Sequence, residues 1–253
     1  MLTYPVPTTR EEKFTIIHTL KEKLLISYGE NIIAIGVYGS IGKKNEGAYS
    51  DIEMHVVTQN GFVLPDNEFI YLPFKVELDC NEKSVLIQKA KTVNEMWPIK
   101  AGSFIHIESL YDPTDFFSFL QTLPMQPTDE EFKAAIKKFM IWGPFESMGK
   151  IRNNWENGNH SYLPLGTIDF AWEIASLIGL ANKQYFTTRA KTFEESLHMK
   201  VKPSGYEELV WHILEGKLED KEKLYQICET LWTGLNNWCK ELGIEYINQS
   251  LDV

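Results

Sequence analysis

The fold is decided by a stretch near the N-terminus, Ile32-Ile33-Ala34-Ile35-Gly36-Val37-Tyr38-Gly39-Ser40, which is followed ten residues later by Asp51-Ile52-Glu53. The first seven residues are apolar and rich in β-branched side chains, which predicts a strand buried on both faces. Gly39 and Ser40 end this strand, and the glycines and polar residues of 41–50 predict a turn or loop. A second strand is predicted to begin at Asp51, and alternation places Asp51, Glu53 and His55 on one of its faces.

Three carboxylates in this pattern predict a cation site. Asp51 and Glu53 are expected on the same strand face, about 7 Å apart, which suits a hard cation. A further strand, predicted around 74–79, carries Glu77 as the third carboxylate of the oxygen-rich shell that Mg²⁺ prefers. Gly39 allows a tight turn, so that the Ser40 hydroxyl and nearby backbone N–H groups would hold terminal phosphates of a nucleotide. An isolated Asp-x-Glu is usually the solvated face of a sheet, but the whole pattern favours phosphoryl-type chemistry.

The sequence pattern changes from strand to helix at Thr128. Thr128-Asp129-Glu130-Glu131 is typical of a capping box, and the prolines before it indicate a domain boundary. The remainder predicts helices over about 128–153, 167–181, 206–214 and 220–242, and Pro144 is expected to kink or split the first of them. An opening helix is predicted from Thr8 or Thr9 to Gly29. We therefore expect an α+β protein, with a mixed sheet and flanking helices in residues 1–127 and a helical bundle domain in residues 128–253.

Composition limits the classes of partner and compartment. The 253 residues include 35 acidic and 25 basic side chains and carry a net charge of −10, which argues against a nucleic-acid-coating surface and favours a cationic partner. The three cysteines have no Cys-x-x-Cys spacing, so neither a disulfide framework nor a zinc site is indicated. The apolar runs are shorter than the roughly 20 residues of a membrane span, and the first residues lack a signal-peptide layout. We expect a cytoplasmic protein with no membrane and no nucleic-acid partner.

Two other nucleotide-binding motifs do not fit the glycine-rich stretch. The segment Gly36–Lys44 resembles a P-loop, but five residues separate Gly36 from Gly42 where four are needed, and Lys44 stands at the Ser/Thr position. The glycine spacing also differs from the dinucleotide-binding fingerprint. The carboxylate pattern is therefore the more specific signal.

The residues of the predicted site resemble the signature of the nucleotidyltransferase superfamily that includes DNA polymerase beta, and more closely that of the aminoglycoside 4'-nucleotidyltransferases, the kanamycin nucleotidyltransferase type. This signature comprises Gly36-Val37-Tyr38-Gly39-Ser40 and Tyr49-Ser50-Asp51-Ile52-Glu53-Met54. The resemblance covers essentially the whole chain, because it continues through Lys75-Val76-Glu77, Phe145-Glu146, Gly149-Lys150, Arg152-Asn153, Leu177-Ile178-Gly179-Leu180, Thr187-Thr188 and Pro203-Ser204-Gly205-Tyr206.

The resemblance implies an enzyme that uses Mg-ATP. One or two Mg²⁺ ions would be held by Asp51, Glu53 and Glu77, of which Asp51 and Glu53 would also count as catalytic. The nucleotide would be contacted by Gly39, Ser40, Lys43 and Lys150. In this family the enzyme is a homodimer whose active sites are built from both subunits.

The resemblance also assigns the acceptor side of the reaction. Glu146 would be the general base, although taken alone the Glu146–Lys150 spacing would predict an ordinary salt bridge on a helix face. Glu68, Glu77 and Glu146 would face the aminoglycoside. The chain departs from the family pattern at Lys43, where the family has an arginine, and at Trp142-Gly143, where it has two glutamates. The missing carboxylates would weaken recognition of aminoglycoside ammonium groups.

These observations lead to one main hypothesis and two alternatives. The main hypothesis is transfer of AMP from Mg-ATP to a hydroxyl, the 4'-hydroxyl, of an aminoglycoside such as kanamycin or tobramycin, with release of pyrophosphate and resistance as the result. The first alternative keeps this chemistry but uses another small hydroxylated antibiotic or a protein hydroxyl as acceptor. The second is a catalytically silent nucleotide-binding protein.

Overall fold

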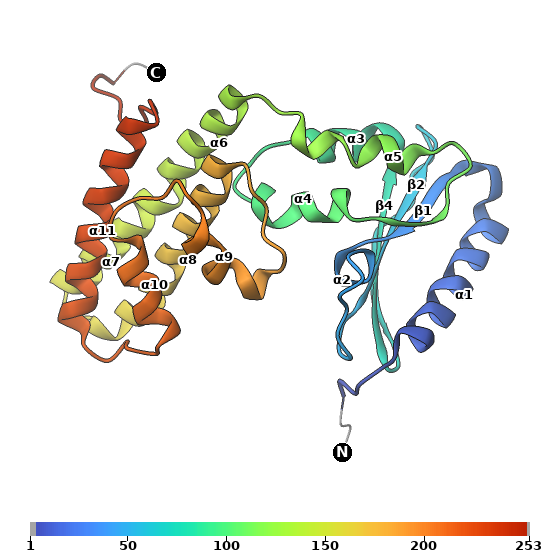
Figure 1. Ribbon diagram of the computed structural model, residues 1–253, viewed down its shortest axis with the longest axis horizontal. Helices are drawn as coiled ribbons and strands as arrows, with labels where there is room; N and C mark the ends of the chain where they lie inside the picture. The colour runs from blue at the N-terminus through green and yellow to red at the C-terminus, as the bar shows by residue number, and fades with distance from the viewer. Residues whose placement is uncertain (1–3, 252–253) are drawn as a thin grey trace. The chain divides into compact units, whose positions relative to one another are not determined.

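The computed structural model describes residues 4–251, which divide into two compact units (Figure 1). The first unit runs through Thr92 and resumes over Ala101–Pro127, and the second combines Val93–Lys100 with the chain from Thr128 onward. Residues 93–100 were expected in the first domain but belong to the second unit. Tertiary contacts explain this difference, because Trp97 packs edge-on against Phe132 with ring centroids 4.8 Å apart.

The first unit is built on a five-stranded mixed sheet in the order β3-β4-β2-β1-β5. Its central β2 pairs antiparallel with β1 and parallel with β4, while β3 and β5 pair antiparallel at the two edges. The strand bounds are β1 Ile32–Val37, β2 Ile52–Thr58, β3 Asn67–Tyr71, β4 Phe74–Glu82 and β5 Glu108–Tyr111. This mixed sheet confirms the expected fold of the N-terminal half.

Helices cover both faces of the sheet (Figure 1). The long helix α1 buries Ile17 in one apolar cluster with strand residues such as Val37 and Met54, while Leu86 of α3 and Phe117 of α5 belong to a second cluster. The helices and 3-10 turns of this part are α1 Arg10–Tyr28, η1 Gly29–Asn31, α2 Gly39–Gly42, α3 Lys83–Lys91, α4 Trp97–Ile105, α5 Phe116–Leu120 and η2 Leu123–Met125. Helix α4 begins in the second unit and ends in the first.

Local sequence signals explain where the first elements begin and end. Thr9 caps α1 in a capping box with Glu12, as expected, and Gly29 ends the helix at φ 46°. Residues 39–42 form the helical turn α2, although the sequence predicted a loop from Ile41. Asp51 lies one residue before β2, so the strand starts at Ile52 and not at Asp51.

The second unit is helical, which confirms the expected bundle. Thr128 caps α6 in a capping box with Glu131, and the chain breaks at Gly143 so that Pro144 begins the separate helix α7. The elements are α6 Asp129–Trp142, α7 Pro144–Glu156, η3 His160–Tyr162, α8 Leu163–Asn182, η4 Arg189–Lys191, α9 Thr192–His198, α10 Tyr206–Leu214 and α11 Lys221–Glu241. Four of the predicted helices are therefore present, with α8 starting four residues earlier than expected.

Helix α8 contains the most apolar segment of the described chain. By length and composition alone the stretch His160–Asn182 is sufficient to cross a membrane, which the sequence analysis did not recognise. In the structure 67% of an apolar 18-residue segment of this stretch is buried inside the protein. Its apolar character is accounted for by packing against α6, α7, α9, α10 and α11.

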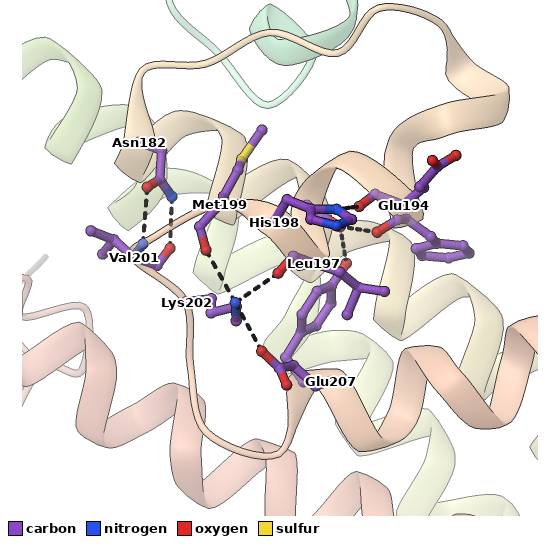
Figure 2. Close-up of polar contacts among 11 residues, drawn as sticks. Asn182, Glu194, Leu197, His198, Met199, Val201, Lys202 and Glu207 are labelled. Carbon is purple, nitrogen blue, oxygen red and sulfur yellow. Dashed lines mark hydrogen bonds and ion pairs between the residues drawn. The ribbon is translucent and has the colours of Figure 1, made fainter.

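The connection between α9 and α10 is held by polar side chains (Figure 2). The Asn182 amide at the end of α8 both donates to the carbonyl of Val201, at 2.7 Å, and accepts from its N–H, at 3.0 Å. The ammonium of Lys202 donates to the carbonyls of Leu197 and Met199. These contacts satisfy backbone groups that an irregular segment would otherwise leave unpaired.

Candidate active site

The parallel pairing of β2 and β4 brings the predicted carboxylates to adjacent strands. Glu53 is the register partner of Glu77, and Asp51 directly precedes β2. Glu77 in turn pairs across the other edge of β4 with Glu68 of β3. The backbone therefore gathers these four predicted residues at one region of the sheet.

The ammonium of Lys75 lies among these carboxylates. Its Nζ is 2.8 Å from Glu68 Oε1, 3.2 Å from Asp51 Oδ2 and 3.8 Å from Glu77 Oε2. The hydrogen bond to Glu68 raises the pKa of Lys75, and contact with Asp51 adds to this despite partial burial. No role was expected for Lys75, although its spacing of two residues from Glu77 on β4 indicates that both share a face.

Gly39 makes room for the carboxylate of Glu53. A Cβ on Gly39 would lie 1.7 Å from Glu53 Oε2, and the residue has φ +61°. Burial, followed by the charges of Asp51 and Glu77, raises the pKa of Glu53 to about 7. The carboxylate is thus held close to a turn and beside groups of like charge, an arrangement that a cation would relieve.

The residues after Gly39 form the candidate phosphate-binding turn. The hydroxyl oxygen of Ser40 is buried and has no hydrogen-bond partner among residues 4–251. Lys43 directly follows α2, and its positive charge lowers the pKa of Glu53 in opposition to the stronger raising effects. Gly42 packs against backbone, since a Cβ there would lie 2.3 Å from the carbonyl oxygen of His106. The turn therefore contains a buried hydroxyl, and the ammonium that follows it acts electrostatically on Glu53.

Tyr38, which precedes this turn, is a second residue to which the sequence analysis gave no role. Its hydroxyl donates to Glu77 Oε1 at 3.1 Å. Burial, and then the charge of Glu77, raises the pKa of this hydroxyl, so it remains a donor at neutral pH. The only sequence signal was its position at the end of the strand before Gly39-Ser40.

Two cavities flank the carboxylates. One, of about 260 Å³, is lined by polar and acidic residues, with Glu68, Glu77 and Asp79 among them. The other, of about 280 Å³, is lined by Asp51 and Lys75 together with aromatic and aliphatic side chains. The first cavity has the charge that a polycationic ligand requires.

In the second unit, Glu146 and Lys150 lie one turn apart on α7. Lys150 Nζ is 2.7 Å from Glu146 Oε1, and more than half of each side chain is exposed. The contact with Glu146 raises the pKa of Lys150. Glu173 of α8 is a further carboxylate in this unit: its Oε1 accepts from the Ser147 hydroxyl at 2.9 Å, and its buried Oε2 has no hydrogen-bond partner among the residues that the structure describes. Glu173 belongs to no sequence motif and was not expected to have a role.

Comparison with known proteins identifies the family of this chain. The KNTase C-terminal domain family model matches residues 114–245. Two proteins, from a Bacillus species and from Staphylococcus aureus, are named aminoglycoside nucleotidyltransferase (4'), and each is 34% identical over 239 residues, 94% of this chain and 94% of the relative. This chain belongs to the aminoglycoside 4'-nucleotidyltransferase family. It is therefore a nucleotidyltransferase enzyme, and the silent nucleotide-binding alternative is set aside.

A solved structure supports the fold assigned to this nucleotidyltransferase. A nucleotidyltransferase-like protein from Exiguobacterium sibiricum matches with a TM-score of 0.53 and 13% identity, covering 89% of this chain and 75% of that one. At this identity the likeness concerns the fold alone.

The donor set of the first unit fits the divalent cation that nucleotidyltransferases generally use. The carboxylates of Asp51, Glu53 and Glu77 are the hard oxygen donors that Mg²⁺ prefers, and the glycine turn leaves space at Glu53 that a Cβ would fill. Within residues 4–251 no three His, Cys, Asp or Glu side chains already stand as a preformed metal cluster. Lys75 Nζ lies 3.2 Å from Asp51 Oδ2 and 3.8 Å from Glu77 Oε2, so an ammonium neutralises part of this carboxylate charge in the structure.

Proposed function

We propose that this enzyme transfers AMP from ATP to the 4'-hydroxyl of an aminoglycoside such as kanamycin or tobramycin, releases pyrophosphate and thereby confers resistance. The observation that carries the proposal is the placement of Glu53 and Glu77 at paired positions of adjacent strands, with Asp51 directly before β2 and with Glu53 against the Gly39 turn. The 4'-nucleotidyltransferase names of the two relatives support the class of acceptor.

The acidic cavity supports an aminoglycoside as acceptor. Its walls include Glu68, Glu77 and Asp79, and aminoglycosides carry several ammonium groups at neutral pH. Carboxylates bind ammonium groups through charge-assisted hydrogen bonds. Glu68 is well exposed and pairs with the Lys75 ammonium in the structure, and its accessible carboxylate supports a role in contacting an ammonium group of the acceptor.

The reaction needs a base and positive charge toward the leaving group. In the proposed step the acceptor oxygen bonds to the α-phosphorus of ATP, the bond from that phosphorus to the pyrophosphate oxygen breaks, and Glu146 takes the hydroxyl proton. Lys43 and Lys150 stabilise the charge that develops on pyrophosphate. The buried Ser40 hydroxyl, which has no hydrogen-bond partner in the described part of the chain, donates to a phosphate oxygen.

Asp51, Glu53 and Glu77 would hold one or two Mg²⁺ ions, with Glu146 outside this set. When bound, Mg²⁺ supplies screening of phosphate charge. The aminoglycoside-facing residues are proposed to be Glu68, Glu77 and Glu146. We further propose a cytoplasmic homodimer with shared active sites and with no nucleic-acid or membrane partner.

The decisive experiment measures magnesium-dependent pyrophosphate release from ATP with kanamycin, tobramycin and dibekacin, the last of which lacks the 4'-hydroxyl. Release with kanamycin and tobramycin, but not with dibekacin, is expected. Asp51→Asn should abolish release while leaving the circular dichroism spectrum unchanged, and full activity in this variant would contradict the metal assignment. Parallel assays with GTP test the preference for ATP.

A different acceptor is the second candidate. Trp142 stands where the family has a glutamate, and in the structure its side chain is 48% exposed. An exposed indole favours an acceptor with more apolar surface and fewer ammonium groups. Pyrophosphate release with another hydroxylated antibiotic, and with no aminoglycoside, would support this candidate.

A further inference from the structure

Three stacked rings lie behind Glu77 in the first unit. Tyr38, directly after β1, stacks on His55 of β2, with ring centroids 4.1 Å apart and planes inclined by 21°. His55 stacks in turn on Phe104 of α4, at 5.8 Å and 8°. Tyr38 and His55 are only 6% and 1% exposed, so their neighbours fix the position of both rings.

Polar contacts fix the rotation of the central ring. His55 Nδ1 lies 3.0 Å from Asp79 Oδ2, and His55 Nε2 lies 3.1 Å from the carbonyl oxygen of Ser103. Asp79 is itself held, because the Asn81 amide donates to Oδ1 at 2.7 Å. The hydrogen bond at Nε2 and the rings of Tyr38 and Phe104 on its two faces fix the plane of His55, while Nδ1 lies within ion-pair distance of Asp79 without hydrogen-bond geometry.

The stack of three rings ends at the carboxylate of Glu77, which Tyr38 contacts. The Tyr38 hydroxyl donates to Oε1, while Oε2 lies 3.8 Å from the Lys75 ammonium. Oε1 of Glu77 is therefore held by the buried Tyr38, whereas Oε2 faces the Lys75 ammonium. A glutamate side chain has three rotatable bonds, and this hydrogen bond removes much of their freedom.

We propose that Tyr38 is a positioning residue, supported by the His55–Asp79 pair, which orients Glu77 for a divalent cation. The inference rests on the proposed function only for the identity of the cation site. It makes Tyr38 a partner of a metal ligand and not itself a catalytic residue. Outer partners of this kind commonly change metal affinity by about 10-fold or more when they are removed.

The test measures the affinity of the protein for Mn²⁺ in the absence of nucleotide and acceptor. The electron paramagnetic resonance signal of free Mn²⁺ reports how much of the ion is bound. Tyr38→Phe keeps the ring stack and removes only the hydroxyl, and we expect Mn²⁺ affinity to fall by about 10-fold. Tyr206→Phe is the matched control, because it removes a buried hydroxyl that bonds to Ser196 in the other unit. This control should bind Mn²⁺ as the wild type does.

A purely structural role for Tyr38 predicts a different result. In that case Tyr38→Phe would lower the melting temperature but leave Mn²⁺ affinity unchanged, and this outcome would overturn the inference. Turnover provides a second readout: the Mg²⁺ concentration for half-maximal rate should rise, while kcat at saturating Mg²⁺ changes little.

A variant of the supporting pair extends the test. His55→Phe retains an aromatic ring for stacking but loses both polar contacts, so we expect weaker Mn²⁺ binding, with little further loss when Tyr38→Phe is added. If the losses of Mn²⁺ affinity in the two single variants add up fully in the double variant, His55 does not act through Tyr38. Failure of the proposed function is separately visible as absence of pyrophosphate release by the wild type, whereas failure of this inference is equal Mn²⁺ affinity of Tyr38→Phe and wild type.

Discussion

The carboxylate of Glu53 lies so close to Gly39 that a Cβ on this glycine would fall 1.7 Å from Glu53 Oε2. The two residues come from the turn after β1 and from β2, which are neighbours in the sheet. The glycine thus fixes both the path of the turn and the place of a proposed metal ligand. Replacing it tests the two effects together.

Gly39→Ala should lose most activity because the new methyl group displaces Glu53. Its positive φ adds a backbone cost of about 1–2 kcal/mol. Gly61→Ala is the control, since Gly61 has φ +90° but nothing within 4 Å of its Cβ position. Urea unfolding should show a loss of stability in both variants, and pyrophosphate release should fail only in the first. Equal activities would contradict the displacement of Glu53.

Lys75→Met should make the thermal stability of the protein depend more strongly on added divalent cation. The variant leaves Asp51 and Glu68 without their ammonium partner, and because Lys75 is 41% exposed the loss of stability should be about 1 kcal/mol or less. Millimolar Mg²⁺ should raise the melting temperature more in the variant than in the wild type. Lys133→Met, which removes an exposed pair with Glu130, should show no such difference.

Glu173→Gln should stabilise the protein at alkaline pH. Burial, opposed by the Ser147 hydrogen bond and increased by the Asp169 charge, raises the pKa of Glu173 from 4.5 to about 7. The folded state thus holds a proton that the unfolded state loses, and stability falls as pH rises from about 4.5 to 7, by up to about 3 kcal/mol. Urea unfolding at pH 8 should favour the variant, with the difference shrinking toward pH 4.5. Glu156→Gln, at an exposed position, should show no pH-dependent difference in stability from the wild type.

Glu146→Gln tests the base. We expect kcat to fall by about 10²- to 10⁴-fold, with a much smaller change in the KM for ATP. Lys150 loses its 2.7 Å ion pair in this variant, so Lys150→Met is the companion that reports loss of the cation alone. An equal loss in kcat and in ATP affinity for Glu146→Gln would argue against proton transfer.

Long periodic elements could be predicted from the sequence, and short edge elements could not. The capping boxes at Thr9 and Thr128 locate α1 and α6 because their signals are local. The edge strands β3 and β5 have five and four residues and no regular apolar alternation, so only their pairing defines them. Residues 93–100 join the second unit through Trp97, a contact that no local pattern encodes.

The same distinction applies to the site. Alternation along one strand was sufficient to place Asp51 and Glu53 together, whereas the contact of Lys75 with Glu68 depends on the pairing of β3 with β4. Glu173 lies in the most apolar helix and belongs to no motif, so its orphaned oxygen is visible only after α7 and α8 pack. Sequence spacing therefore indicates neighbours within an element but not partners between elements.

Because Glu53 and Glu77 are paired in register, insertions or deletions inside β2 or β4 should have a different effect from those in the connection between strands. A residue inserted or deleted within β2 or β4 would turn one carboxylate to the opposite side of the sheet, since side chains alternate. The connection 59–66 lies outside both strands, and its length can change while main-chain hydrogen bonds hold the two glutamates opposite each other. Relatives should therefore differ in length in this connection and keep constant length inside the strands.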